Sequence, residues 1–405
     1  MKTNIDEKVI DEVLERGLLS EIYPTKEEFK KKLMSGERFR FYIGMDPTAQ
    51  ALHLGHAQNL MILEDFRKLG HEVIFLIGDF TGMIGDPTDK GAARVRQTRE
   101  DVERNFKGWL EQTKNILSFN DSENPVQVKY NSEWLSKLNF EEILDLASNF
   151  TAQQMMERDM FQKRLKEEKP IYLHEFLYPL MQGYDSVAMD VDVELCGTDQ
   201  IFNALAGRTL MKKLKNKDKF VVSTILIQDE KTGQLMSKSA GTGVFLDLNS
   251  NDLYGAIMAL TDGMIRPLAL GCTRLSLVEI EELMGMENPR DAKMKLAFEI
   301  TRIYHGEEKA QEAQENFKTQ FQQKGVPENV EEKEIVEKTE LVSLLVELGF
   351  VSSKSEARRK IDEGAVKIDD EKITDVNYQI DVNKGQEKIL KLGRKIIKLV
   401  ESQKS

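Results

Sequence analysis

Two histidines separated by two residues occur near the start of the chain, in the run His53-Leu54-Gly55-His56. If this run begins a helix, both imidazoles project on one side and can donate hydrogen bonds to phosphate oxygens. Gly55 has no side chain, so an adenine or ribose can approach the backbone there. The alternatives are two surface histidines or half of a zinc site, and zinc is disfavoured because no third ligand follows at the required spacing. Taken alone, the run fits nucleotide chemistry, but a pair of surface histidines is the simpler interpretation.

A lysine follows about 180 residues later, in the run Leu235-Met236-Ser237-Lys238-Ser239. Glycines and small polar residues on both sides of the run predict a mobile loop. Lys238 is then a movable cation that can reach phosphates when the loop closes. In isolation, a solvated lysine in a flexible loop is the simpler interpretation.

The elements that must position these groups follow a strand–helix–strand pattern. Residues 38–45 alternate in polarity and predict a strand, which Asp46 and Pro47 end in a turn. Apolar residues at helical spacing over 56–69 predict a helix, and the apolar run 73–77 is typical of a strand buried on both faces. Such a unit predicts parallel strands joined by a right-handed crossover. Nucleotides bind where the first strand gives way to the helix, which is where His53 stands.

The rest of the chain divides by pattern. Strands expected at 126–130, 192–195 and 221–227 complete an α/β domain with a doubly wound, Rossmann-like parallel sheet over residues 1–245. Consecutive helical patterns over 250–322 predict an α-helical domain at 246–325. The acidic stretch 326–338 predicts a linker. A helix over 353–363 and a tight hairpin over 366–373 predict a small α+β domain at 339–405.

Composition narrows the class of protein. The 405 residues are 40% hydrophobic and 31% charged, which suits two or three soluble domains. The net charge of −12 argues against a general nucleic-acid binder, so an RNA partner must meet a local basic patch. Cys196 and Cys272 are the only cysteines, which excludes a disulfide framework and a four-cysteine zinc site. No apolar run approaches the ~20 residues of a membrane span, so we expect a cytoplasmic protein without a membrane partner.

The two runs together resemble the HIGH and KMSKS signatures of class I aminoacyl-tRNA synthetases. Within that class, YIGMDPTAQALHLGH, FLIGDFTGMIGDPT, YPLMQGYD and CGTDQ resemble the tyrosyl enzymes, and the likeness runs through nearly the whole chain. The tryptophanyl enzymes are the nearest relatives, but they are expected to have a different first motif and no C-terminal RNA-binding module. The resemblance implies an enzyme that activates L-tyrosine with ATP, which carries Mg²⁺, and then transfers tyrosine to the 3′ end of its tRNA. It also implies a homodimer and a helical domain that faces the anticodon stem.

The resemblance assigns roles residue by residue. The catalytic set contacts the phosphates and comprises His53, His56, Lys238 and Thr48. The nucleotide-binding set is Asp46, Gly55, Gly197, Asp199, Met236, Ser237 and Ser239. In the tyrosine-binding set, Tyr42 and Asp185 hold the phenolic hydroxyl, while Asp86, Tyr178 and Gln182 hold the ammonium with Gln200 nearby. A hydroxyl can donate to a carboxylate and accept from a phenol, so phenylalanine would leave two buried polar groups unpaired.

Each assignment has a purely structural alternative. Tyr42 would be a packed core aromatic, and Asp46 and Asp86, each before a proline, would be turn residues. Tyr178, Gln182 and Asp185 would share a solvated helical face.

Two departures from the family pattern concern ATP binding. Leu235 replaces the first lysine of the mobile-loop signature. Asp89 stands where the family is expected to have glycine, beside Lys90 and Arg94, which resemble pyrophosphate-contacting positions.

The C-terminal segment is less acidic than the rest of the chain. Residues 340–405 contain 13 Lys or Arg and 12 Asp or Glu, against 44 and 57 in residues 1–339. SSKSEARRKIDEGAVKI resembles the αL motif of S4-like RNA-binding domains, whose basic face suits the phosphates of folded RNA. The expected tRNA contacts are Arg358, Arg359, Lys360, Lys391, Arg394 and Lys395. A solvated charged face is the alternative.

Two other functions compete with this interpretation. A small-molecule nucleotidyltransferase also uses paired histidines to bind phosphates, but it does not need an RNA-binding C-terminal domain. A non-enzymatic RNA-binding paralogue with a decayed active site would explain Leu235, but not the retained His53, His56 and Lys238.

Overall fold

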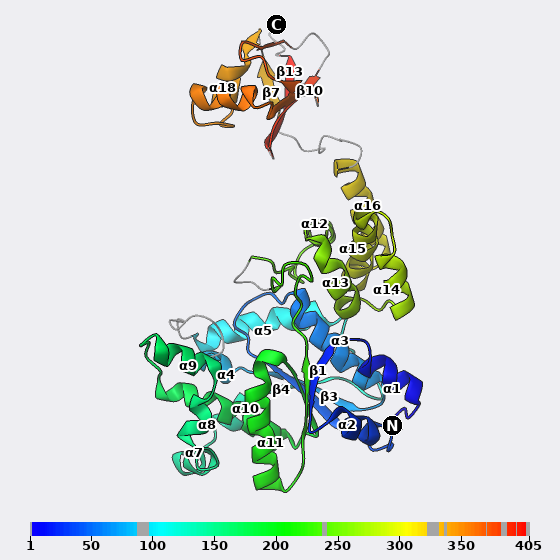
Figure 1. The fold of residues 1–405 in the computed structure, drawn as a ribbon, viewed down its shortest axis with the longest axis vertical. Helices are drawn as coiled ribbons and strands as arrows, with labels where there is room; N and C mark the ends of the chain where they lie inside the picture. The colour runs from blue at the N-terminus through cyan, green and yellow to red at the C-terminus, as the bar shows by residue number, and fades with distance from the viewer. Residues whose placement is uncertain are drawn as a thin grey trace. The chain divides into compact units, whose positions relative to one another are not determined.

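The structure is a computed structural model of the whole chain. It describes residues 2–86, 97–236, 241–321, 332–335, 338–369, 371–381, 387–393 and 395–401. The chain forms two compact units, Met1–Glu315 and Asn316–Ser405, and each is described separately (Figure 1).

A six-stranded sheet lies at the centre of the first unit, in the order β1-β6-β5-β2-β3-β4. The strands are β1 (Leu19–Tyr23), β2 (Arg40–Met45), β3 (Glu72–Ile77), β4 (Gln127–Tyr130), β5 (Val193–Gly197) and β6 (Phe220–Thr224). β2 to β6 run parallel to their neighbours, and β1 runs antiparallel to β6. The predicted α/β class with a parallel sheet is confirmed. β1 was not predicted, because exposed Ser20 and Glu21 deprive this edge strand of an apolar run.

The parallel strands bring their carboxyl ends to one edge of the sheet. β2 ends at Met45, β3 at Ile77 and β5 at Gly197, so the residues that follow each strand meet at the same edge. β3 is buried over Val73–Ile77, as expected for a central strand with both faces covered. The sheet therefore presents Asp46, Gly78 and Thr198 together.

Helices surround this sheet. They are α1 (Glu7–Leu14), α2 (Lys26–Leu33), α3 (Leu54–Lys68), α4 (Thr81–Ile84), α5 (Arg99–Thr113), α6 (Ser132–Leu135), α7 (Phe140–Ala147), α8 (Ala152–Met156), α9 (Asp159–Lys166), η1 (Leu173–Phe176), α10 (Tyr178–Met189), η2 (Thr198–Gln200) and α11 (Ile201–Lys215). α10 and α11 pack very closely, and glycine at position 183 permits this. A Cβ there would lie 3.1 Å from the Gly207 nitrogen. α3 carries the paired-histidine run at its start, as predicted, and buries Leu60, Leu63 and Phe66.

A block of helices follows the sheet in the first unit. It comprises α12 (Ser250–Met258), η3 (Asp262–Met264), α13 (Ile265–Cys272), α14 (Leu277–Met284) and α15 (Pro289–His305), and α16 (Glu307–Phe321) continues into the second unit. Figure 1 shows α12 to α15 gathered apart from the sheet.

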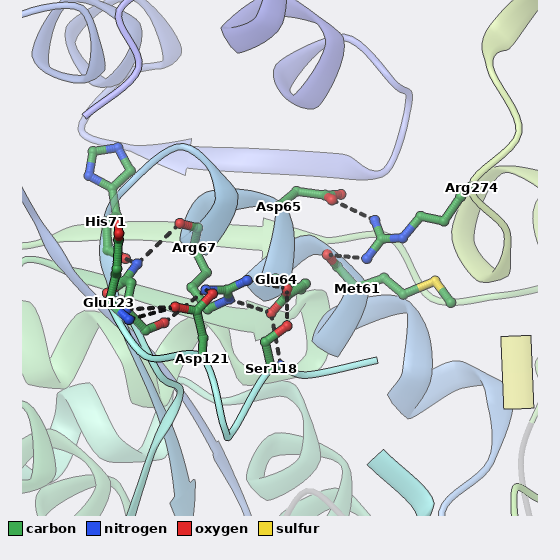
Figure 2. Close-up of polar contacts among 10 residues, drawn as sticks. Met61, Glu64, Asp65, Arg67, His71, Ser118, Asp121, Glu123 and Arg274 are labelled. Carbon is green, nitrogen blue, oxygen red and sulfur yellow. Dashed lines mark hydrogen bonds and ion pairs between the residues drawn. The ribbon is translucent and has the colours of Figure 1, made fainter. Parts of the chain in front are cut away.

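Polar contacts hold α3 from two sides (Figure 2). On one side Arg67 forms a buried ion pair with Glu64 at 2.8 Å and reaches Asp121 at 2.9 Å. On the other side Arg274, just after α13, pairs with Asp65 at 2.5 Å. A buried ion pair adds little net stability but tolerates few alternative geometries. These contacts therefore fix the helix that positions the imidazoles.

The second unit has its own core around a five-stranded sheet in the order β10-β9-β12-β13-β7. Its elements are β7 (Glu332–Ile335), β8 (Thr339–Glu340), α17 (Leu341–Glu347), α18 (Lys354–Asp362), β9 (Val366–Ile368), β10 (Glu371–Ile373), β11 (Gln379–Ile380), β12 (Glu387–Leu392) and β13 (Lys395–Glu401). The predicted α18, capped by Ser353, and the β9–β10 hairpin are confirmed. The linker expected at 326–338 is corrected in part, because it contains β7, which pairs in parallel with β13. Only Ile335 of that polar strand is buried, so the local sequence gives no strand signal.

No helix in the described part of the chain is long and apolar enough to cross a lipid bilayer.

Candidate active site

The two imidazoles at the start of α3 are locked by backbone hydrogen bonds. His53 is the N-cap residue, and its Nδ1 accepts the Gly55 N–H at 3.1 Å. The Nδ1 of His56 accepts the His53 N–H at 3.1 Å, and the ring centroids lie 3.9 Å apart. Because a neutral imidazole carries one proton and each Nδ1 is an acceptor, the proton of each ring lies on Nε2. Each ring therefore presents one N–H donor.

The surroundings keep both rings neutral. Burial lowers the pKa of His53 to about 4 and that of His56 to about 3, and the proximity of His53 lowers the pKa of His56 further. Gly55 is required at its position, because a Cβ there would lie 2.9 Å from the His53 ring. The geometry therefore gives two neutral donors instead of two cations at pH 7.

This neutrality predicts a pH dependence. We expect the NMR signals of the His53 and His56 rings to stay constant from pH 8 to pH 5.5, whereas in urea-unfolded protein they titrate near the ordinary pKa of 6.5. As the pH falls from 6.5 towards 4, only the unfolded chain takes up these protons, so the free energy of unfolding should decrease over this range. A ring inflection near pH 6.5 in the folded protein would contradict the assignment.

The segment after the predicted mobile loop meets the start of α3, and the segment before it pairs with residues 227 and 228. After the loop, the Val244 carbonyl accepts the Leu54 N–H at 3.0 Å, and Phe245 forms a backbone bridge with His53. Before the loop, the Met236 N–H donates to the Ile227 carbonyl at 2.8 Å, and Met236 is buried. The segment that follows the predicted loop therefore lies against the start of α3.

Most of the other residues predicted to contact phosphates from loops lie outside the described part of the chain. Ser237, Lys238 and Ser239 lie outside the described residues, as do Asp89, Lys90 and Arg94. Leu235, which replaces the signature lysine, forms a backbone bridge with Gln228 and leaves its side chain 39% exposed.

Asp46 is not merely a turn residue. Its carboxylate accepts hydrogen bonds from the Thr81 hydroxyl at 2.6 Å and from the Tyr178 phenol at 2.7 Å. Burial raises the pKa of Tyr178 well above the ordinary value, and the negative charge of Asp46 adds to the rise. Gly78 leaves room for this carboxylate, since a Cβ there would lie 2.0 Å from Asp46 Oδ1. The structure thus joins a predicted nucleotide-side residue to a predicted ammonium-side one.

The predicted phenol-binding residues are both buried. The Tyr42 hydroxyl lies 2.9 Å from the Ser186 hydroxyl. The Asp185 carboxylate accepts the Trp134 indole N–H at 2.7 Å and the Asn131 amide at 3.3 Å. Burial raises the pKa of Asp185 well above the usual carboxyl value, while these two donors oppose the rise. Asp185 is close enough to raise the pKa of Tyr42 as well, after burial and Glu194.

Sequence reasoning missed the partners of Asp185. Asn131 follows β4 directly, so its place at the carboxyl end of a parallel strand was an available signal. Trp134 gave no signal, because only the fold brings its indole to α10. Asn131 also donates to the Thr81 hydroxyl at 2.9 Å, which links Asp185 to Asp46.

The predicted ammonium site is made of linked amides and carboxylates. The Gln200 amide donates to Asp86 at 2.7 Å and to Asp199 at 3.2 Å. The Gln182 amide instead donates to Glu194 at 2.9 Å. Gly197 leaves space beside Asp199, because a Cβ there would lie 2.5 Å from Asp199 Oδ1.

Thr48 stands at the turn after β2, where its N–H donates to the Asp46 carbonyl at 2.7 Å. Among the residues that the structure describes, no group of three or more His, Cys, Asp or Glu side chains could hold a metal ion.

Comparisons with known proteins show the family of the chain. A family model described as tRNA synthetases class I (W and Y) matches residues 34–322, and one described as a tyrosine–tRNA ligase SYY-like C-terminal domain matches residues 316–400. A tyrosine–tRNA ligase of Thermotoga maritima is 39% identical over 95% of both chains. One of Moorella thermoacetica is 41% identical over 95% of this chain and 93% of the relative.

Solved structures show the same fold. A C-terminally truncated mitochondrial tyrosyl-tRNA synthetase of Coccidioides posadasii has a TM-score of 0.63 and 24% identity, over 76% of this chain and 91% of that one. A tyrosyl-tRNA synthetase of Archaeoglobus fulgidus, complexed with L-tyrosine, has a TM-score of 0.57 and 19% identity, over 76% and 99%.

Proposed function

Because the chain belongs to the tyrosine–tRNA ligases of the class I tRNA synthetase family, we propose that its paired imidazoles and buried phenol pocket carry out the ATP-dependent activation of tyrosine. The enzyme activates L-tyrosine with ATP to tyrosyl-adenylate and pyrophosphate, and then transfers tyrosine to its tRNA. The observation that carries the site proposal is the hydrogen bonding of both Nδ1 atoms, which leaves two neutral Nε2–H donors at the start of α3.

These donors suit the chemistry of the first step. The tyrosine carboxylate attacks the α-phosphate, a carboxylate–phosphorus bond forms, and the bond to the β-phosphate breaks as pyrophosphate leaves. No protein nucleophile is needed, so catalysis consists of binding the charge that develops in the transition state. His53 and His56 donate to the α- and β-phosphate oxygens, Lys238 holds the departing pyrophosphate, and Thr48 lies on the phosphate side. ATP carries Mg²⁺ into the site.

The substrate tyrosine is recognised at both ends. Tyr42 and Asp185 bind its hydroxyl, one as a donor and one as an acceptor. Its ammonium is held by Asp86, Tyr178 and Gln182, with Gln200 beside them. The nucleotide lies along Asp46, Gly55, Gly197, Asp199, Met236, Ser237 and Ser239.

Pyrophosphate exchange tests this assignment. Labelled pyrophosphate should enter ATP when tyrosine and Mg²⁺ are present, without tRNA. Tryptophan and phenylalanine serve as the competing amino acids. Exchange that depends on tryptophan would reassign the pocket, and no exchange with any amino acid would favour a decayed site.

We also propose that the second unit contacts tRNA as an S4-like domain. Arg358 and Arg359 are exposed on α18, and Lys360 follows them. Lys395 fits this role less well, because its ammonium donates to the Gly349 and Phe350 carbonyls at 2.6 and 3.0 Å. Lys391 remains part of the proposal, and Arg394 lies outside the described residues.

Charge reversal of Arg358 and Arg359 to glutamate should separate the two reaction steps. We expect tyrosine-dependent exchange to stay unchanged and tRNA binding to weaken, with the salt dependence of binding reduced by about one unit per lost phosphate contact. The matched control reverses the exposed Lys8 and Lys31 on α1 and α2, which should change neither step. Equal loss of exchange and tRNA charging would mean that α18 is structural.

A homodimer is proposed from exposed apolar side chains next to the site. Leu173 of η1 is 83% exposed, and Leu165 of α9, Tyr172 and Leu177 are also exposed. Exposed apolar side chains of this kind are typical of a subunit interface. Leu173→Glu should convert a dimer into a monomer in sedimentation experiments, whereas Leu214→Glu, an exposed leucine on α11, should not. A wild-type monomer would contradict the proposal. With ATP and tRNA as substrates, the enzyme is proposed to act in the cytoplasm.

A further inference from the structure

A buried ion pair lies beneath the tyrosine pocket. Lys219, immediately before β6, is fully buried, and its ammonium pairs with Glu194 of β5, which is 2% exposed. Burying two charges costs desolvation that their attraction repays only in part, and apolar residues of similar size are often equally stabilising. The function of the pair is therefore inferred from the side chains that it contacts.

The ammonium sets the direction of one hydrogen-bond chain. Lys219 Nζ lies 2.8 Å from Ser186 Oγ, and an ammonium can only donate, so the serine oxygen accepts. The serine proton then has two possible acceptors, the Tyr42 oxygen at 2.9 Å and a Glu194 oxygen at 3.5 Å. The shorter contact is the stronger one. Ser186 therefore donates to Tyr42, and the Tyr42 proton is left for another acceptor, which is Glu194 as long as no substrate hydroxyl is present.

The carboxylate sets the direction of a second chain. Glu194 Oε1 lies 2.9 Å from Gln182 Nε2, and an ionised carboxylate can only accept. This fixes which side of the Gln182 amide faces Glu194. The carbonyl oxygen of Gln182 is then turned away from the pair, as an acceptor.

The backbone leaves space for this arrangement. A Cβ on Gly207 of α11 would lie 2.5 Å from Lys219 Nζ and 2.8 Å from Ser186 Oγ. Real Cβ atoms do not approach so closely, so the close packing of α10 on α11 depends on glycine where the buried ammonium lies.

We propose that Lys219 and Glu194 are positioning residues that set the hydrogen-bond polarity of the tyrosine pocket. Through Ser186 the lysine makes Tyr42 a donor towards the substrate hydroxyl, which in turn donates to Asp185. Through its carboxylate the glutamate presents the Gln182 carbonyl oxygen to the substrate ammonium. The inference rests on the proposed roles of Tyr42 and Gln182.

The test compares tyrosine and phenylalanine in pyrophosphate exchange, with the full-length enzyme. Ser186→Ala breaks the first chain and leaves the ion pair intact. It should lower kcat/KM for tyrosine about tenfold, leave the value for phenylalanine unchanged and leave KM for ATP unchanged. The double variant Lys219→Met/Glu194→Gln removes both charges together, which avoids a lone buried charge. It should lower the selectivity similarly and also raise KM for tyrosine.

The matched control is Ser223→Ala, a fully buried serine on β6 that bonds the Glu21 backbone instead of the pocket. It should leave the selectivity unchanged. Equal losses for tyrosine and phenylalanine in Ser186→Ala, or an unchanged ratio, would overturn the inference. Tyr42→Phe distinguishes failure of the pocket assignment from failure of the hydrogen-bond network. If Tyr42→Phe keeps the wild-type ratio, the pocket assignment is wrong, whereas a lost ratio in Tyr42→Phe but not in Ser186→Ala rejects the polarity network alone.

Discussion

Replacing Asp185 with alanine is expected to lower kcat/KM for tyrosine about 10²-fold, with little effect on phenylalanine. Asp185 is 3% exposed and accepts from Trp134 and Asn131. Its removal leaves these two donors and the substrate hydroxyl without an acceptor in a buried site. A lost hydrogen bond to a buried charge costs about 3 kcal/mol, which corresponds to about 10²-fold. Steady-state pyrophosphate exchange with each amino acid measures the change.

Two further variants sharpen this result. Asp185→Asn keeps one acceptor oxygen but turns an NH₂ group towards groups that also donate, so it should recover only part of the loss. Asp218→Ala removes an exposed carboxylate that pairs with Lys212, and it should leave tyrosine selectivity unchanged. An Asp185→Ala enzyme that still rejects phenylalanine as wild type does would place the hydroxyl site elsewhere.

Replacing His56 with alanine is expected to lower the rate of adenylate formation by about 10²–10³-fold, the usual cost of removing one transition-state donor. The ring is neutral and presents Nε2–H, so its contribution is a hydrogen bond to developing phosphate charge and not a proton transfer. KM for tyrosine should change little, since the interaction strengthens only in the transition state. Single-turnover measurement of adenylate formation isolates this step.

The control must separate catalysis from helix stability, because His56 also accepts the His53 N–H at the start of α3. Thr25 caps α2 through its hydroxyl, which accepts the Glu28 N–H at 3.1 Å. Thr25→Ala thus removes a helix cap without touching the site, and it should cost stability of about 1 kcal/mol with an unchanged rate. A His56→Ala rate close to that of wild type would exclude the imidazole from phosphate binding.

The sequence predicted those parts of the molecule that depend on local pattern. The strand β2 follows from alternation, the helix α3 from apolar residues at helical spacing over 56–69, and the strand β3 from an apolar run. β1 and β7 escaped prediction, since polar edge strands are defined by partners that lie about 200 and about 65 residues away.

In the candidate site, the sequence predicted individual residues but not their partners. Motif resemblance named Tyr42, Asp46 and Asp185, but not what holds them. Their neighbours Ser186, Thr81 and Trp134 come from other elements, and only the packing of β2, α4, α6 and α10 brings them together. Hydrogen-bond direction was equally beyond the sequence, because it depends on distances between these side chains.

We propose that the nucleotide phosphates and tyrosine bind side by side at the start of α3. A crystal structure with a non-hydrolysable sulfamoyl analogue of tyrosyl-adenylate tests it most directly. We expect the sulfamoyl group within hydrogen-bonding distance of an Nε2 atom of His53 or His56, and the phenol between Tyr42 and Asp185. An analogue bound elsewhere, or one whose phenol points away from both residues, would contradict it.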